Sequence, residues 1–338
     1  MSSIHIPVTV DNIGNAYAKM DARGVSATVP SIMIHAHADS IGFMVHYIDE
    51  KGFIFTKDIP GYCIADQRNL PNTAVRILSR RNHTTVRGHF VSPVPVHLLQ
   101  SGEEDDPIER HYIPIDIGAP DDEVAGENVA IGDYVVFDPI WYRQQINGEN
   151  IVATSLDDRL GLFGMYKLAK HLQRTTKRPE ITFVSTVAEE IWSGGAKVAA
   201  ENVRPDIAIA LDCSAVADQI RDAEHDVAKR YNNSKLGGGP ILVRGPSVHD
   251  PTFLHLEAIA QGEVGKWVFA HQVEPGFSGM AEHHQTYAAC QGIRSAGIFF
   301  PARYCHTPRE MVEVEDITLT LDLLAGFCQS VARGEYKP

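Results

Sequence analysis

Residues 150–190 read NIVATSLDDRLGLFGMYKLAKHLQRTTKRPEITFVSTVAEE, and this stretch decides the fold class. An apolar strand-like segment opens the stretch, and a second one, ITFVSTV, closes it. Between them, Leu160–Gln173 carries apolar residues in a broad stripe at helical spacing. Strand, helix and strand in this order begin the alternation that is typical of an α/β fold.

Strand-like segments precede this stretch, and the alternation of strand and helix continues after it. Upstream, from Ser31, the segments SIMIHAH, IGFMVHYID and GFIFTKDI are rich in the β-branched and aromatic residues of strands. Downstream, the strand-like segments IAIALDC, WVFAHQV and SAGIFF alternate with helices expected near Pro251–Ala260 and His283–Gln291 and from about Asp316 to Ala332. Long apolar strands are typical of sheets buried on both faces, so we expect a three-layer α/β/α domain with a mixed, mainly parallel sheet.

Residues 67–150 have a different texture. The short segments AVRIL, TTVRGHF, HYIPIDIG and DYVVFDP are separated by Pro, Gly and the acidic loop SGEEDDPIE, without a helical period. This pattern predicts a small, barrel-like all-β domain inserted into the larger one. The expected limits are therefore 1–66 and 151–338 for the α/β domain and 67–150 for the insertion.

Composition restricts the function classes. The chain has 338 residues and a formal net charge of −13, which argues against nucleic acid as a partner because phosphate binding needs clustered Lys and Arg. No apolar run reaches the length of a membrane span, and the five scattered cysteines fit reduced thiols. We therefore expect a cytoplasmic protein without a membrane partner.

Five strand ends in the expected α/β domain carry a potential metal ligand. Ligands of open α/β sheets bind at the carboxyl ends of the strands, so these side chains are expected to meet. Each residue alone also has a structural interpretation: Asp157 and Asp158 could cap a helix, Glu189 and Glu190 could be a solvated pair, and His306 could lie on the surface. The metal interpretation depends on the whole set, which is His37, Asp157, Glu190, Asp212 and His306.

Counting ligands favours two divalent ions. Two histidines and three carboxylates, with one Asp shared, give each ion three protein ligands and leave room for a water. A further carboxylate must take the proton of that water, and adjacent residues point in different directions, so one of Glu189 and Glu190 can bind metal while the other faces the substrate. Asp39 is the expected partner that orients His37.

At this point the motifs resemble a known family, the tetrahedral (TET) aminopeptidases, which include glutamyl and deblocking aminopeptidases with a co-catalytic zinc-exopeptidase fold. The resemblance covers nearly the whole chain. The similar segments are HADSIGFMV, SLDDRLG, TVAEEIWSGGA, IALDCSAVAD and RYCHTPREMVEVEDI, together with VDNIGNAYA and PVPVHLL.

The resemblance implies a role for each site residue. Asp157 would bridge both ions, His37 and Asp212 would hold one, and Glu190 and His306 would hold the other. Glu189 would be the general base, with Asp39 beside it as a second catalytic residue. Such enzymes take Zn²⁺ or Co²⁺ and cleave N-terminal residues from peptides. The inserted β domain would be the dimerisation domain of a large hollow homo-oligomer, commonly of twelve subunits.

Some segments depart from the family pattern. Ser40 stands where the family usually has Glu, Trp192 is a bulky residue in a Gly-rich segment, and Glu282 stands near the position of an Asp. In addition, VDNIGN begins at Val10, where an N-terminal helix usually precedes it. The changes at Trp192 and Glu282 fall in regions expected to shape the substrate pocket.

Two other functions compete with the aminopeptidase. A glycosidase of the endoglucanase type needs two carboxyl groups on opposite sides of a bond, roughly 5 to 9.5 Å apart, and would leave both histidines without a role. A catalytically silent metal-binding or scaffold relative would explain the altered pocket segments, although every ligand position is intact. Sensitivity to a chelator distinguishes the aminopeptidase from the glycosidase. Activity on a panel of peptide substrates distinguishes it from the silent relative.

Overall fold

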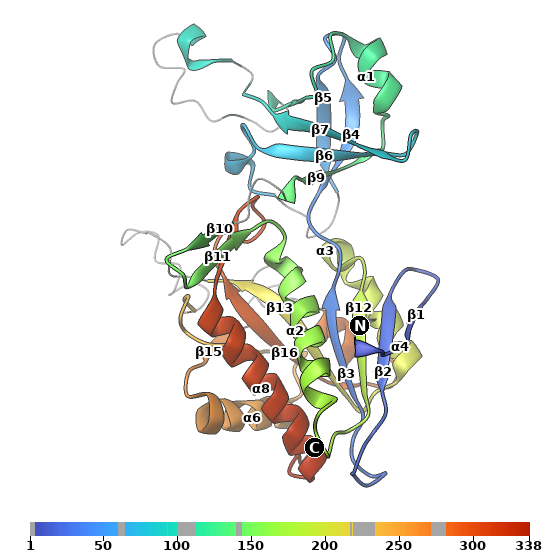
Figure 1. Cartoon of the computed structure of the whole chain (residues 1–338), viewed down its shortest axis with the longest axis vertical. Coiled ribbons are helices and arrows are strands. Elements are labelled where there is room, and N and C mark those ends of the chain that lie inside the picture. The colour runs from blue at the N-terminus through green and yellow to red at the C-terminus, as the bar shows by residue number, and fades with distance from the viewer. Residues whose placement is uncertain are drawn as a thin grey trace.

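The computed structural model describes residues 4–59, 65–92, 94–99, 108, 112–139, 144–216, 218, 234–271 and 282–338. Figure 1 shows a layered α/β body and, at one end of it, a β-barrel. Cys63, the loop of residues 101–107 and residues 279–281 lie outside the described part of the chain.

The α/β body is built on an eight-stranded mixed sheet, as predicted. Strands β12, β3, β13 and β16 run parallel; β2 joins them antiparallel on one side and β14 on the other, while β15 is parallel to β14. In spatial order the strands are β1 (Val8–Val10), β2 (Ala16–Met20), β12 (Ile181–Thr186), β3 (Ile32–His37), β13 (Ile207–Ala215), β16 (Arg294–Ala302), β14 (Ile241–Arg244) and β15 (Val268–His271).

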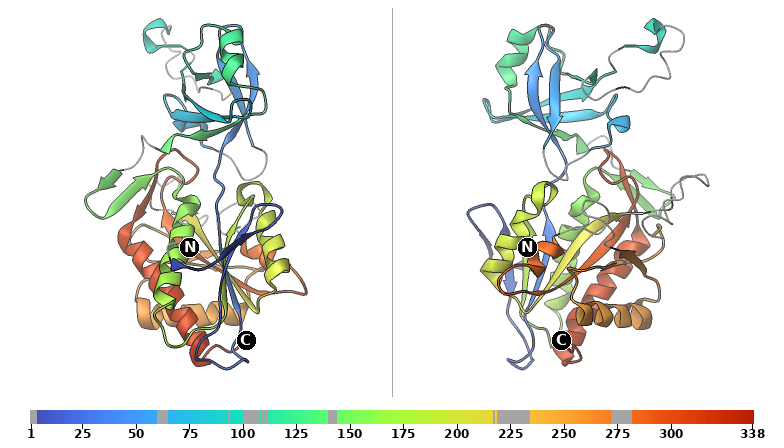
Figure 2. Two further views of the ribbon diagram at one scale, coloured as in Figure 1. Left: turned by 45° about the vertical axis from the view of Figure 1, so that its right-hand side comes forward. Right: turned by 180° about the vertical axis from the view of Figure 1, so that it is seen from behind.

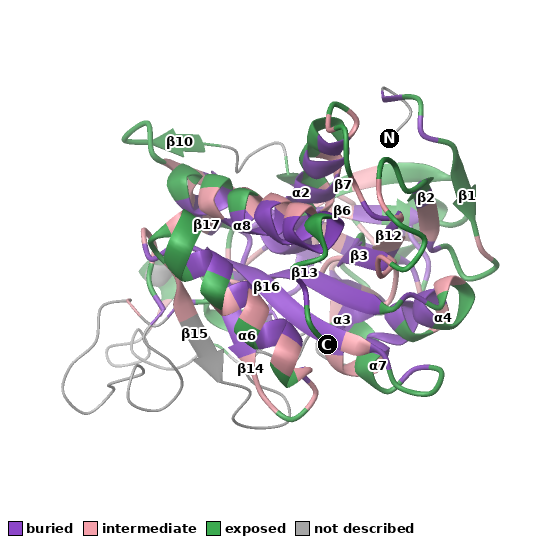
Figure 3. Cartoon of the chain, turned by 90° about the horizontal axis from the view of Figure 1, so that it is seen from below, coloured by how far each residue is buried: buried purple, intermediate pink, exposed green. Residues whose placement is uncertain are grey.

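Helices cover both faces of this sheet, which gives the three layers seen from below in Figure 3. On one face, Ile32 and Ile34 of β3 lie in a core with Leu168 and Leu172 of α2 (Leu156–Leu172). On the other face, Met33 packs with alanines of α4 (Gly194–Val203) and with Ala289. All six residues of β3 are buried, which explains why its sequence shows no polar alternation.

Three further helices begin near the expected positions. They are α6 (Asp250–Ile259), which continues into a π-helical turn (Ala260–Val264), α7 (His283–Tyr287) and α8 (Val314–Arg333). Helix α7 ends at Tyr287, before the expected Gln291. Among the described residues, no helix is long and apolar enough to cross a membrane.

The barrel closes with six strands and holds its own core. Phe43 packs edge-to-face against Phe90 and Phe137, at ring-centroid distances of 5.1 and 5.6 Å. Both views of Figure 2 place the barrel at one end of the molecule, beyond the carboxyl end of β3. Its strands are, in order, β4 (Phe43–Ile48), β5 (Ile54–Asp58), β8 (Ile115–Asp116), β7 (Thr84–Phe90), β6 (Ala74–Ser79) and β9 (Tyr134–Phe137), and helix α1 (Asp122–Asn128) precedes β9.

The barrel begins earlier than residue 67. Strands β4 and β5 were expected in the large sheet, and that expectation is wrong, because they pair with each other and with barrel strands β9 and β8. A strand pattern shows which side chains are buried but does not name the pairing partner. The expected end at residue 150 also differs, since β10 (Gln144–Ile146) and β11 (Asn150–Ala153) form a separate small sheet with β17 (Glu310–Glu313). The strand expected before Asp157 in the large sheet is thus β11, which lies outside that sheet.

Candidate active site

The five predicted ligand residues meet at the carboxyl edge of the large sheet. His37 ends β3 and Asp212 lies within β13, while Asp157 stands at the irregular start of α2. Glu190 belongs to the short helix α3 (Glu189–Trp192), and His306 follows β16. Four of the five side chains are buried and His306 is half-buried, so segments distant in sequence converge on one small volume.

Asp157 lies between the two histidines. Its Oδ1 is 3.0 Å from His37 Nε2, and its Oδ2 is 3.7 Å from His306 Nε2. On either side of this carboxylate, Asp212 Oδ1 lies 3.7 Å from His37 Nε2, and Glu190 Oε2 lies 3.4 Å from His306 Nε2. Asp157 therefore faces both histidines.

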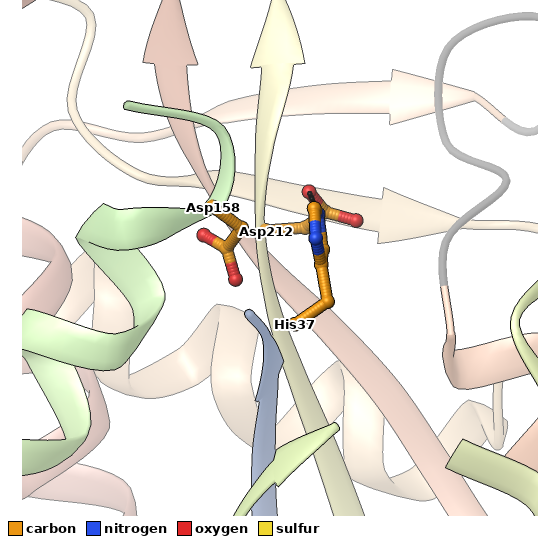
Figure 4. Close-up of side chains that lie close together, drawn as sticks. All are labelled: His37, Asp158 and Asp212. Carbon is orange, nitrogen blue, oxygen red and sulfur yellow. Dashed lines mark ion pairs between the residues drawn. The ribbon is translucent and has the colours of Figure 1, made fainter. Parts of the chain in front are cut away.

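The donor atoms suit divalent cations. One atom each from His37, Asp157 and Glu190 lies within 4.8 Å of the others, and the same holds for His37, Asp158 and Asp212. Figure 4 shows the second group, with side chains that come from β3, α2 and β13. Imidazole nitrogens with carboxylate oxygens are the donor set of zinc and related ions.

Burial and mutual repulsion disfavour the charged carboxylates of the protein without metal. The pKa of Glu190 is raised to about 10, first by burial and then by the nearby charge of Asp157, and the same two causes raise the pKa of Asp212 to about 7. Burial alone would raise the pKa of Asp157 as well, but its contacts with His37 and His306 outweigh burial and lower it. A buried site with this excess of acids favours a bound cation.

Asp39 organises the site differently from the prediction. His37 Nδ1 lies 3.0 Å from the main-chain carbonyl oxygen of Asp39 and 3.7 Å from its carboxylate. A carbonyl only accepts, so Nδ1 carries a hydrogen; Nε2 donates to the Asp157 carboxylate at 3.0 Å in the metal-free protein, and it is the nitrogen that a cation would take in place of that proton. The Asp39 carboxylate instead accepts the backbone N–H groups of Glu189 and Glu190, at 3.2 and 3.1 Å. It therefore fixes the start of α3.

The segment that carries Glu189 and Glu190 is also held from the N-terminal side. Asn15 is fully buried, accepts the N–H of Val187 at 3.1 Å and donates to the carbonyl of Gly195 at 3.0 Å. A Cβ at Gly195 would lie 2.0 Å from the Val187 carbonyl oxygen, so only glycine allows this approach. The VDNIGN motif thus contributes a clamp on both ends of the acidic segment.

Sequence reasoning missed two acidic residues at the site. Asp158 accepts the N–H of Gly161 as the expected helix cap, but its Oδ2 is buried without a hydrogen-bond partner, and its side chain belongs to the His37–Asp212 group. Glu310 is buried and accepts the N–H groups of Asp157 and His306. Its only signal in the sequence is its position four residues after His306.

The two departures near the pocket have defined positions. Glu282 is buried, and its Oε2 lies 2.8 Å from Nδ1 of the buried His35, two residues before His37. Trp192 is 61% exposed at the end of α3, and its ring covers Gly194, where a Cβ would lie 2.5 Å from it. Glu282 is therefore an interior residue bonded to the strand that carries His37, whereas Trp192 lies on the surface at the end of α3.

The sequence profile of the M42 glutamyl aminopeptidases matches residues 14–323. The chain belongs to the M42 glutamyl aminopeptidase family. The lysyl aminopeptidase of Pyrococcus furiosus is 27% identical over 337 residues, which cover 98% of this chain and 89% of the relative.

Two solved structures extend the M42 comparison. An aminopeptidase of the archaeon Desulfurococcus kamchatkensis is 25% identical with a TM-score of 0.83, over 100% of this chain and 90% of its own. The Pyrococcus horikoshii TET1 peptidase, which can assemble into a tetrahedron or a large octahedral shell, is 22% identical with a TM-score of 0.78, over 96% and 90% of the two chains. The second likeness concerns the fold alone. As an M42 aminopeptidase, this chain is a hydrolase that removes N-terminal residues from peptides.

Proposed function

We propose that this aminopeptidase is metal-dependent and works with two divalent ions, Zn²⁺ or Co²⁺, held around Asp157. The position of Asp157 between His37 and His306 carries the proposal. One ion would be held by His37, Asp212 and Asp157, and the other by Glu190, His306 and Asp157. When bound, such ions lower the pKa of a shared water and stabilise negative charge on the scissile carbonyl oxygen.

Glu189 is the proposed general base. It is buried at the first position of α3, with its Oε2 4.0 Å from His37 Nε2, so it borders the ligand cluster without lying between the histidines. Ser193 donates its hydroxyl to Glu189 Oε1 at 3.3 Å and restricts the carboxylate to one orientation. Burial raises the pKa of Glu189, which favours uptake of a proton from the attacking water and its delivery to the leaving amine.

Two substitutions test the roles of base and bridge together. We expect Glu189→Gln to keep both ions and to lower kcat by about 10² to 10⁴-fold, the usual contribution of general-base catalysis. Asp157→Asn should instead deplete both ions. Metal content by mass spectrometry and kcat on aminoacyl-anilides measure the two effects. Metal loss in Glu189→Gln, or full metal content in Asp157→Asn, would contradict the assigned roles.

A chelator tests metal dependence directly. Peptide hydrolysis should stop after removal of divalent ions and return with Zn²⁺ or Co²⁺, because the bound ions would activate the water and polarise the scissile carbonyl. Hydrolysis that is insensitive to the chelator would exclude a two-ion site.

Assembly and location are part of the same proposal. The barrel of residues 43–137 would be the inserted dimerisation domain of a homo-oligomer built from dimers, as large as twelve subunits. Support comes from the exposed apolar residues Leu78 and Tyr134 on its outer face and from the shells formed by the TET1 peptidase. A cytoplasmic location agrees with the described cysteines, which are free thiols.

A further inference from the structure

Glu310 joins two segments that the chain brings together only in the folded state. It is the first residue of β17 and is 2% exposed. Its Oε2 accepts the backbone N–H of Asp157 at 3.0 Å, and its Oε1 accepts the backbone N–H of His306 at 3.2 Å. Among the described residues, no lysine or arginine forms an ion pair with this carboxylate, so backbone donors hold it.

Both residues that Glu310 binds have backbones that regular structure does not hold. His306 has a φ of +61°, in the left-handed region that favours glycine, and so does Tyr304 two residues earlier. Asp157 has a non-helical conformation at the start of α2, just after Ser155 at a φ of +56°. Neither segment is held by the backbone hydrogen bonds of a helix or strand. The two hydrogen bonds to the Glu310 carboxylate therefore hold both backbones at a fixed separation.

Glu310 itself is held by a rigid frame. Strand β17 pairs with β11 so that Glu310 lies opposite Ala153, at the end of the strand that leads to Asp157. Thr154, just after β11, donates its hydroxyl to the carbonyl of Pro308, just before β17, at 3.0 Å, and so adds a further bond between the two segments. The segments that carry Asp157 and His306 therefore both adjoin the β11–β17 strand pair.

We infer that Glu310 is a positioning residue that sets the separation of Asp157 and His306, and through it the affinity of the ion held by Glu190, His306 and Asp157. The inference rests on the proposed ligand set. Asp212 and His37, which face the other ion, receive no bond from Glu310 among the described contacts. Loss of Glu310 should therefore weaken one ion more than the other.

The experiment is a Zn²⁺ titration of the metal-free full-length protein in competition with a chromophoric chelator. In Glu310→Gln one acceptor oxygen becomes an NH₂ group, which cannot accept the second backbone N–H. In Glu310→Asp the charge and both oxygens remain, but the shorter side chain cannot span both donors. Glu313→Gln is the matched control, because it makes the same chemical change on the same strand without touching either ligand residue.

We expect both Glu310 variants to bind one Zn²⁺ about 10 to 100-fold more weakly while the other stays near its wild-type affinity, in line with the cost of removing partners of metal ligands. Glu313→Gln should bind both ions as the wild type does. Melting temperatures of the metal-free proteins show that each variant is folded.

Three results would overturn the inference. Wild-type affinities in Glu310→Gln would remove the role altogether. Wild-type affinities in Glu310→Asp alone would show that only the charge matters. Equal weakening of both ions would show a general structural effect. Failure of the wild-type protein to bind two Zn²⁺ would instead refute the proposed ligand set, and the inference with it.

Discussion

Asp157, Glu190 and Asp212 place three carboxylates in a small buried volume, and only two histidines balance them. The raised pKa values of Glu190 and Asp212 and the raised pKa of Glu310, to about 8 by burial and by Asp157, describe the energetic consequence. In the folded protein without metal these groups hold protons that the unfolded chain releases near pH 4. A cation removes this conflict by taking the place of the protons.

The metal-free protein should therefore lose stability as the pH rises from about 4.5 toward 7 and beyond. Because the folded state binds more protons in this window, each such group lowers the free energy of unfolding by up to about 1.4 kcal/mol per pH unit. His37, whose pKa is raised by Asp157 and Asp212 despite burial, acts in the same direction, and the lowered pKa of Asp157 acts only below its ordinary value of 3.8.

Thermal unfolding with a chelator, and separately with saturating Zn²⁺, measures this effect. The melting temperature should fall with rising pH in chelator, and the stabilisation by Zn²⁺ should grow over the same range. A metal-free protein that becomes more stable between pH 5 and pH 8 would contradict the assignment of the buried acids.

At the scale of elements, the short helix α3 depends on bonds from outside itself. Its four residues are flanked by Ala188 and Ser193, both at positive φ, so it cannot be stable alone. Asp39 holds its first N–H groups and Asn15 joins the chain before and after it. The orientation of Glu189 and Glu190 is thus determined by the first forty residues of the chain.

Asn15→Ala should test this clamp. The change leaves the Val187 N–H and the Gly195 carbonyl buried without their partner, at a cost of about 1–3 kcal/mol in stability. We also expect a lower kcat, because the base is no longer fixed. Thermal unfolding and peptide kinetics measure both effects, and Asn12→Ala, at an exposed position in the same motif, is the control. Equal kcat in the two variants would mean that Asn15 does not act on α3.

The elements differ in how far sequence could predict them. Strands β3, β12 and β13 and helix α2 were predictable because their apolar runs are long, and five strand ends marked the residues that the structure brings together. The sequence could not predict that β4 and β5 belong to the barrel, because a short alternating strand fits the barrel as well as the large sheet. Glu310 resembles a solvated acid in the sequence, since its burial arises only when β17 pairs with β11.

At the scale of the whole molecule, the barrel exposes an apolar face. Leu78 of β6 pairs with Tyr134 of β9, and Tyr134 pairs with Met44 of β4, which places the three side chains in one row across the outer surface. Leu78 and Tyr134 are 44% and 51% exposed. A row of this kind is typical of a surface that another subunit covers.

The double substitution Leu78→Asp and Tyr134→Asp should reduce the size of the assembly. Buried charges at a subunit interface are costly, so we expect dimers or monomers in place of the proposed large oligomer. Size-exclusion chromatography with light scattering measures this, with Val124→Asp on α1 as the control for a new acid on an exposed apolar barrel position. An unchanged mass in the double variant would assign assembly to another surface.

The connection from the large sheet to the barrel is short. His37 ends β3, and Phe43 already begins the first barrel strand. The N–H of Asp66, beyond β5, bonds to the carbonyl of His306 at 3.2 Å. The segments that carry the two proposed ligand histidines, His37 and His306, are thus both joined directly to the barrel or to the chain beside it. In an oligomer assembled through the barrel, a tilt of the barrel would therefore displace both histidine-bearing segments together.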